Sequence, residues 1–349
     1  MRSKTGENAF SYKKHTKKKA LLIVTGVILC LVAFFLNLLV GSSGMSISDL
    51  VGVIFDPGHA EPVNKIIVWQ YRLPMAVMGI LAGFVLGLAG ATMQTILNNP
   101  LASPYTLGVS AGASVGASLA IVLGLGSYLS LGRLLVPACA FVFAFLACAG
   151  IYFFARVKNF TSETMVLVGI GMVFLFQAVQ TFIQYMASAE ELQTAMFWTF
   201  GSLSKADWFN IPVIFAVLLA CFIFIYSNSW NLTAMKLGDE KAKVLGVDIE
   251  KVRMRMFVAI SLMTSVTVAF VGCIGFIGII GPHIARMLIG EDQRFFLPFS
   301  CACGTVVLSF ASLLAKIIVP GSIFPIGIIT SILGVPFYFV LLISKKRKH

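Results

Sequence analysis

The chain has 349 residues, of which 58% are hydrophobic and only 11% are charged, and its mean hydropathy is +0.94. Because soluble domains carry about 25% charged residues, this composition excludes a soluble globular protein and indicates an integral membrane protein. The net charge of +12 comes mainly from Lys and Arg gathered at both ends of the chain and in one internal loop. That placement is typical of an oriented membrane protein and does not indicate nucleic-acid binding.

Runs of roughly 20 apolar residues predict an all-α fold with ten transmembrane helices. Their expected ranges are 21–40, 75–96, 107–126, 134–155, 164–186, 211–227, 255–273, 276–289, 297–315 and 324–343, the eighth being short for a span. Most Lys and Arg lie on the side of the N-terminus, which predicts that both termini are cytoplasmic. We expect residues 1–19 to be a basic, disordered cytoplasmic tail and residues 20–349 to be a single membrane domain.

Glycines recur at every fourth position in the second and third of these helices. They are Gly79, Gly83, Gly87, Gly108, Gly112 and Gly116. Because small residues let membrane helices approach closely, this spacing predicts tight helix packing, which many polytopic proteins share.

The polar residues that could carry chemistry are few. None of the 14 acidic residues falls in the middle of a predicted span, so an ion-coupled secondary carrier lacks an obvious coupling site. The sequence contains no GxxxxGK[ST] phosphate loop, so energy from ATP would come from a partner. The seven cysteines lie in apolar runs and His283 lies near a helix end, so we predict no catalytic residue, no metal site and no cofactor, which also disfavours a membrane-embedded enzyme.

The loop 228–254 carries a short amphipathic segment between two glycines. Leu237 and Gly238 precede it, Leu245 and Gly246 close it, and Ala242 shares a face with Leu245. The alternative is a mixed-charge loop that serves solubility alone, but the glycine borders favour a docking helix for a cytoplasmic partner. We therefore expect Ala242→Asp to leave the protein folded while abolishing its stimulation of a partner ATPase.

The fifth predicted span places four polar residues on one helical face. They are Gln177, Gln180, Thr181 and Gln184, separated by offsets of 3, 4 and 7. Glutamines are costly against lipid, so this face should meet protein or water. It either lines a translocation pathway or makes hydrogen bonds within the subunit.

Three separated groups of residues resemble the FecCD-type permeases of ABC importers for iron-siderophores, haem and cobalamin. The groups are Arg72-Leu73-Pro74 with Asn99-Pro100-Leu101-Ala102 and Gly108-Val109-Ser110; Leu237-Gly238 with Leu245-Gly246-Val247; and Gly275-Phe276-Ile277-Gly278 with Gly281-Pro282-His283-Ile284-Ala285-Arg286 and Pro325-Ile326-Gly327. The resemblance covers nearly the whole chain beyond residue 20. It implies ten helices, a pathway lined by the fifth helix, a second identical or paralogous permease subunit, two cytoplasmic ATP-binding subunits and an external binding protein.

The same resemblance implies that basic residues on the outer face pair with acidic residues of the binding protein. Arg72 and Lys316 are the candidates here, although a lone Arg can equally anchor lipid headgroups. The family often has Asp and Arg where this chain has Ser312 and Lys316, so the external charge pattern is thinner. Within the family an iron-siderophore is the expected substrate, with haem or cobalamin as alternatives. The expected location is the inner or plasma membrane.

Overall fold

The structure is a computed structural model that describes residues 2–41, 44–127, 132–158, 160–318 and 324–345. Every element in these ranges is helical. The long helices are α1 (Arg2–Leu39), α4 (Leu73–Ile96), α6 (Gly132–Val157), α7 (Ser162–Met186), α9 (Asn210–Ser227), α12 (Ile249–Val271) and α14 (Gln293–Ile318). Three shorter apolar helices are α5 (Val109–Val122), α13 (Ile277–Ile289) and α15 (Ile326–Lys345).

These ten helices coincide with the ten predicted spans. Seven of them are long and apolar enough to cross a membrane, and the three shorter ones include the predicted eighth span, now α13. A helix of 13 residues is about 20 Å long, so α13 cannot cross a hydrocarbon core of about 30 Å by itself. It is instead packed inside the protein between α4 and α14.

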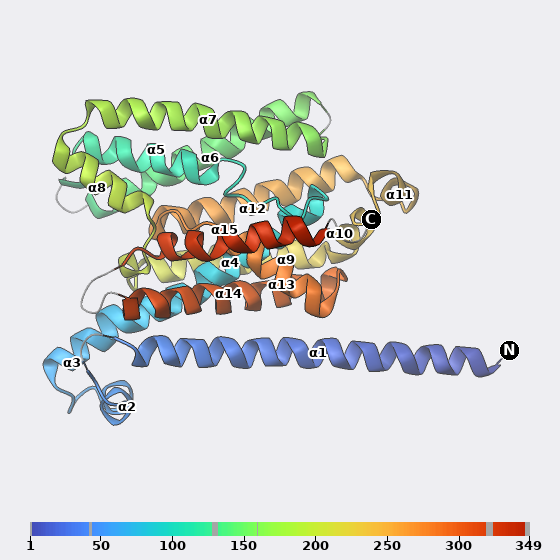
Figure 1. Cartoon of the computed structure of the whole chain (residues 1–349), viewed down its shortest axis with the longest axis horizontal. Coiled ribbons are helices and arrows are strands. Elements are labelled where there is room, and N and C mark those ends of the chain that lie inside the picture. The colour runs from blue at the N-terminus through green and yellow to red at the C-terminus, as the bar shows by residue number, and fades with distance from the viewer. Residues whose placement is uncertain (1, 42–43, 128–131, 159, 319–323, 346–349) are drawn as a thin grey trace.

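The helices run side by side along the longest axis of the molecule (Figure 1). The start of α1 and the end of α15 lie at one end, together with α10 (Ser229–Met235) and α11 (Asp239–Val244). The opposite end carries α2 (Ile47–Phe55), α3 (Pro62–Ile66) and α8 (Ala189–Thr199). We refer to the end with α11 as the basic end, because the Lys-rich start of α1 and the basic loop around α11 lie there.

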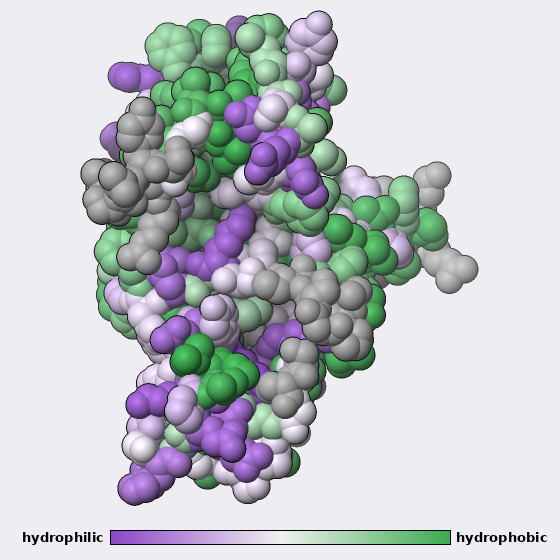
Figure 2. Space-filling view, turned by 90° about the vertical axis from the view of Figure 1, so that its left-hand side faces the viewer, coloured by the Kyte–Doolittle hydropathy of each residue, from purple (hydrophilic) through white to green (hydrophobic). Residues whose placement is uncertain are grey.

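Three short helical elements remain in the described residues, one π-helix and two 3₁₀ turns. They are the π-helix Ile67–Arg72, which leads into α4, and the 3₁₀ turns Leu125–Ser127 and Leu203–Lys205. Viewed from the end with α2, α3 and α8, hydrophilic residues gather most densely over α2 and α3 (Figure 2). The exposed acidic residues there are Asp49, Asp56 and Glu61.

The protein core is built around α4, which packs against α14, α13, α12 and α9. A Cβ atom on Gly83 or Gly87 would meet the backbone of α14, and one on Gly90 would meet the backbone of Gly278 in α13. In the third span, Gly112 and Gly116 lie in the same way against backbone carbonyls of α6. Gly83, Gly87, Gly112 and Gly116 therefore serve close helix packing, as predicted from the spacing. Gly79 would meet only a side-chain atom of Leu203, and Gly108 (φ +90°) is the left-handed residue that precedes α5.

The expectation of a disordered basic tail over residues 1–19 stays a prediction. Helix α1 begins at Arg2, so it includes most of the segment 1–19 that we expected to be disordered. The segment contains no proline, and Lys and Ala are good helix formers, so a helix nucleated in the apolar span can extend backwards through it. The basic residues after Lys345 lie outside the described residues.

Candidate functional site

Helix α11 is a six-residue helix that two left-handed glycines delimit. Gly238 (φ +99°) precedes it and Gly246 (φ +82°) follows it, and neither conformation suits a residue with a Cβ atom. The amide of Gly246 bonds to the carbonyl of Lys243 at 2.9 Å and that of Val247 to the carbonyl of Ala242 at 3.1 Å. This pair of bonds is the Schellman motif, which ends a helix sharply. The predicted glycine borders are therefore the observed ends of the helix.

The side chains of α11 divide differently from our expectation. Ala242 is fully buried, whereas Leu245 is 52% exposed and Leu237 is 56% exposed. The predicted face of Ala242 with Leu245 is thus not one surface. Val244, which sequence reasoning missed, is 88% exposed, and Leu237, Val244 and Leu245 are the exposed apolar side chains of this segment. Ala242 is instead where α11 rests on the protein, because a small side chain allows close contact there.

Arg253 of α12 holds α11 in place, and nothing in the sequence patterns pointed to it. Its side chain is 3% exposed, and its Nη2 atom lies 2.9 and 3.1 Å from the two carboxylate oxygens of Asp239. Its Nε donates to the carbonyl of Ile96 at 2.7 Å and its Nη1 to the carbonyl of Phe160 at 2.7 Å. One guanidinium therefore joins α11, the end of α4 and the segment that leads into α7.

A second polar cluster lies beside α11 at the basic end. Arg286 of α13 donates to the side chain of Gln94 at 2.8 Å and lies 3.0 Å from Glu291, which also pairs with Lys236 at 3.3 Å. The side chain of Gln94 in turn donates to the carbonyl of Gly278 at 3.2 Å. These contacts tie α13 to α4 and to the segment before α11, whereas the ring of His283 lies 5.5 Å from that of Phe337 in α15.

The four polar residues predicted on the fifth span lie on α7, but they do not share one environment. Gln177 and Thr181 are exposed, and the hydroxyl of Thr181 donates to the carbonyl of Gln177 at 3.0 Å. Gln180 and Gln184 are half-buried, and the Gln180 amide donates to the hydroxyl of Ser118 in α5 at 2.7 Å. Gln180 thus makes a hydrogen bond within the chain, while Gln177 and Thr181 face away from it.

Arg72 and Lys316 meet at the end of α1 that is distant from the basic end. Nη1 of Arg72 donates to the carbonyls of Leu38 at 2.8 Å and Leu39 at 3.1 Å, and Nζ of Lys316 donates to the carbonyl of Asn37 at 2.6 Å. Arg72 is 6% exposed. The last carbonyls of a helix have no partner within it, so both cations cap α1. Their predicted role in binding-protein docking stays a prediction.

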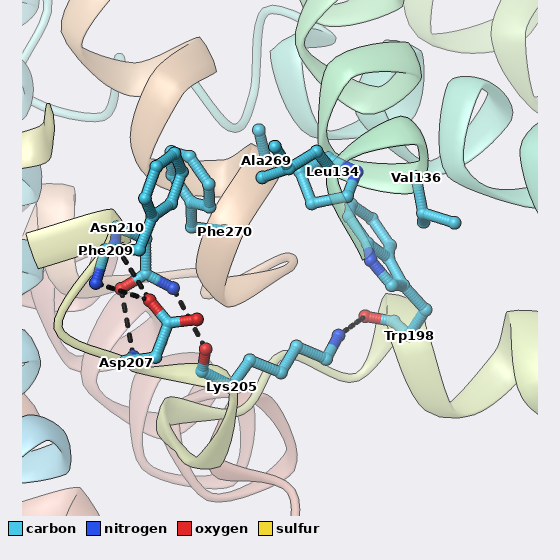
Figure 3. A pocket seen from close by; sticks show the side chains of 10 residues that line it. Leu134, Val136, Trp198, Lys205, Asp207, Phe209, Asn210, Ala269 and Phe270 are labelled. Carbon is cyan, nitrogen blue, oxygen red and sulfur yellow. Dashed lines mark hydrogen bonds between the residues drawn. The ribbon is translucent and has the colours of Figure 1, made fainter. Parts of the chain in front are cut away.

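A cavity of about 280 Å³ lies near the same end, between α6, α8, α9 and α12 (Figure 3). Apolar side chains line most of it, and the ammonium group of Lys205 lies 4.8 Å from the centre of the Trp198 ring and 3.5 Å from the Trp198 carbonyl. On the other side Asp207 accepts hydrogen bonds from the amides of Phe209 and Asn210. Burial lowers the pKa of Lys205 to about 8.

The apolar bundle, with a short helix held rigidly at its basic end, is the architecture of a multi-pass membrane permease. The sequence profile of the FecCD transport family matches residues 29–345. The chain belongs to that family and is a permease subunit of an ABC importer in the inner membrane. Permeases of this kind work with ATPase subunits and substrate-binding proteins.

The relatives of this chain are named for the import of different substrates. An ABC transporter permease protein of Methanocaldococcus jannaschii is 39% identical over 97% of this chain and 98% of its own length. An Fe(3+)-citrate import system permease of Bacillus subtilis is 34% identical, covering 95% and 97% of the two chains, and a vitamin B12 import system permease of Serratia proteamaculans is 34% identical, covering 96% and 95%. A solved metal-chelate type ABC transporter in an inward-facing conformation aligns with a TM-score of 0.82 and 26% identity over 93% of this chain and 99% of that chain.

Proposed function

We propose that this permease forms the translocation pathway for an iron-siderophore complex that an external binding protein delivers. Two kinds of observation support an iron chelate as the substrate. Among the relatives are permeases named for import of iron(3+)-citrate and of iron(3+)-hydroxamate, and the structural neighbour is of metal-chelate type. The exposed polar side chains Gln177 and Thr181 on α7 are uncharged, which suits a wall that a charged complex passes without being trapped.

The energy for transport comes, in this proposal, from two ATP-binding subunits at the basic end. The observation that carries this assignment is α11, which presents Leu237, Val244 and Leu245 to solvent although it is fixed to the bundle by Ala242 and Arg253. A rigid helix with an exposed apolar surface fits insertion into a groove of a partner. A flexible loop that served only solubility would need neither the buried alanine nor the buried arginine.

α7 is the helix that we assign to the contact with the second permease subunit and to the pathway between the two subunits. It packs on α5 and α6 at the edge of the molecule, and it is mostly exposed (Figure 1). The external binding protein would approach the end opposite the basic end, where Arg72 and Lys316 lie at the end of α1. Cobalamin is the second candidate substrate, because vitamin B12 permeases match this chain as well as the iron-citrate permease does.

Uptake into proteoliposomes tests the function directly. The permease is reconstituted with its ATPase subunits and binding protein, and the uptake of ⁵⁵Fe-loaded siderophores is compared with that of labelled cobalamin. We expect uptake of a ferric siderophore that requires ATP inside the vesicles and persists when proton and sodium gradients are dissipated. ATP-dependent uptake of cobalamin alone would replace the substrate assignment, whereas uptake driven by an ion gradient would refute the mechanism.

A further inference from the structure

We propose that Arg253 is the mechanical link that transmits movement of α11 to α4 and α7. The inference rests on the proposed function, in which the ATP-binding subunits move α11. It goes further by assigning the path along which that movement reaches the membrane helices, and by naming Arg253 and Asp239 as positioning residues on that path.

The guanidinium of Arg253 has a specific partner for each of its nitrogen atoms. Nη2 pairs with both carboxylate oxygens of Asp239, Nη1 bonds to the carbonyl of Phe160 and Nε bonds to the carbonyl of Ile96, all between 2.7 and 3.1 Å. Arginine carries five donors in one rigid plane, so a displacement of one partner tilts or shifts the plane and changes the hydrogen bonds to the other two partners. Lysine also has three N–H donors, but they all lie on one nitrogen atom and cannot match acceptors spaced around a guanidinium plane.

Each partner is itself a point at which a helix can be moved. Asp239 is the first residue of α11, and Ile96 is the last residue of α4, whose carbonyl has no partner within the helix. Phe160 precedes α7 by two residues and is 1% exposed, with its ring 5.3 Å from that of Tyr152. The contact at Phe160 is therefore firmly packed, and the hydroxyl of the next residue, Thr161, caps α7 by accepting the amide of Thr164.

The burial of Arg253 makes the link stiff. The side chain of Arg253 is 3% exposed, whereas that of Asp239 is 49% exposed. Loss of the carboxylate would leave the arginine charge without its counter-ion in a region that excludes water, so the pair is expensive to separate. Movement of α11 by a partner would for this reason carry Arg253 with it, and with it the end of α4 and the start of α7.

The link also connects two features that are far apart in sequence. α11 carries the exposed apolar residues proposed to meet the ATP-binding subunit, and α7 carries the polar face proposed for the pathway. Arg253 is the residue of α12 that touches both the first residue of α11 and the segment that leads into α7. A purely structural arginine would stabilise the fold without changing how much transport each hydrolysed ATP produces.

The test uses Asp239→Asn in the complete transporter, with Glu240→Gln as the matched control. Both variants remove one negative charge from the first turn of α11, but the pair with Arg253 involves only Asp239. The amide of Asn keeps the shape and one acceptor for Arg253 but removes its counter-charge, so the assembly of each variant with the ATP-binding subunits is measured first as a check on folding. We expect substrate transported per ATP hydrolysed to fall by about 5-fold or more, the lower end of usual coupling between distant sites, with no such change in Glu240→Gln.

A second readout follows the movement itself. A single cysteine replacing Gln177 on α7, in a protein without its native cysteines, is labelled with a water-soluble maleimide with and without ATP. We expect ATP to change the labelling rate in the parent and in Glu240→Gln, but not in Asp239→Asn or Arg253→Lys. An ATP response in Asp239→Asn equal to that of the parent, or unchanged transport per ATP, overturns the link. A parent that shows no ATP-driven uptake at all refutes the proposed function instead, and the link falls with it.

Discussion

The position of Ala242 gives the sharpest test of how α11 is mounted on the protein. Ala242 has no exposed surface, whereas Val244, two residues along the same helix, is 88% exposed. Aspartate at position 242 would place a carboxylate where water does not reach, at an effective cost of several kcal/mol. Aspartate at position 244 would remain in water. The two substitutions add the same charge to one six-residue helix, so Val244→Asp is the control for Ala242→Asp.

The expected magnitude follows from the local opening of α11. If burial of the carboxylate costs about 3 kcal/mol, the equilibrium for detaching α11 shifts by about two orders of magnitude. Hydrogen–deuterium exchange of the peptide that contains α11 should accelerate to that extent in Ala242→Asp and remain unchanged in Val244→Asp. This expectation replaces our sequence-based one, which held that Ala242→Asp would leave the protein folded and act only on the partner.

Stimulated ATP hydrolysis also distinguishes Val244→Asp from Ala242→Asp. Val244→Asp should keep α11 in place yet reduce ATP hydrolysis stimulated by the binding protein, because it adds charge to the proposed apolar contact. Equal exchange of the α11 amides in Ala242→Asp and in the parent would contradict the packing of α11 described above. Normal stimulation in Val244→Asp would contradict the use of this surface by the ATP-binding subunit.

Further expectations concern other parts of the molecule. Arg72→Gln combined with Lys316→Gln should lower the unfolding temperature equally at low and high salt, because the lost hydrogen bonds to the end of α1 are buried and those of charged groups contribute about 1.5–3 kcal/mol each. A loss confined to binding-protein affinity at low salt would instead favour a docking role. The control is Lys65→Gln, because Lys65 is exposed. Gly90→Ala should abolish the yield of monodisperse protein, because the added Cβ atom would collide with the backbone of Gly278, whereas Gly171→Ala should not, because space is open around Gly171. A normal yield of Gly90→Ala would be inconsistent with the contact between α4 and α13. The pKa of Lys205 lies below its ordinary value of 10.5, so the unfolded state binds more protons between pH 8 and 10.5 and the stability of the fold should rise with pH across this window. The unfolding temperature of Lys205→Met should lack that rise. An identical rise in Lys205→Met would refute the lowered pKa of Lys205. Cysteines at positions 177 and 181 should react with a water-soluble maleimide faster than one at position 180, which faces Ser118; the reverse order would mean that α7 is rotated.

The elements that the sequence predicted well are those defined by a repeating physical requirement. Long apolar runs have to be helical in a membrane, so the ten predicted ranges agree with the observed helices. Glycines at every fourth position mark close helix contacts, and Gly83 and Gly87 make them with α14. Gly238 and Gly246 were expected as helix borders, and their positive φ angles agree.

What the sequence could not predict are the contacts between residues far apart in the chain. The pattern of α11 showed a small residue and a leucine on one side, but which side faces the bundle depends on where α12 lies. Arg253 stands in the basic loop region, where an arginine reads as an orientation signal. Its partners Ile96 and Phe160 contribute only backbone carbonyls, which leave no trace in the side-chain sequence.

The three basic residues Arg72, Arg253 and Lys316 follow one physical rule. Each donates to carbonyls at or near the end of a helix: Arg72 and Lys316 to α1, and Arg253 to α4. These carbonyls have no partner in their own helix and cannot be left unpaired where water is scarce, and the negative end of the helix dipole favours a cation there. A basic residue beside an apolar span can therefore belong to the packing of the bundle as well as to its orientation. The difference shows only when the end of another helix is found next to it.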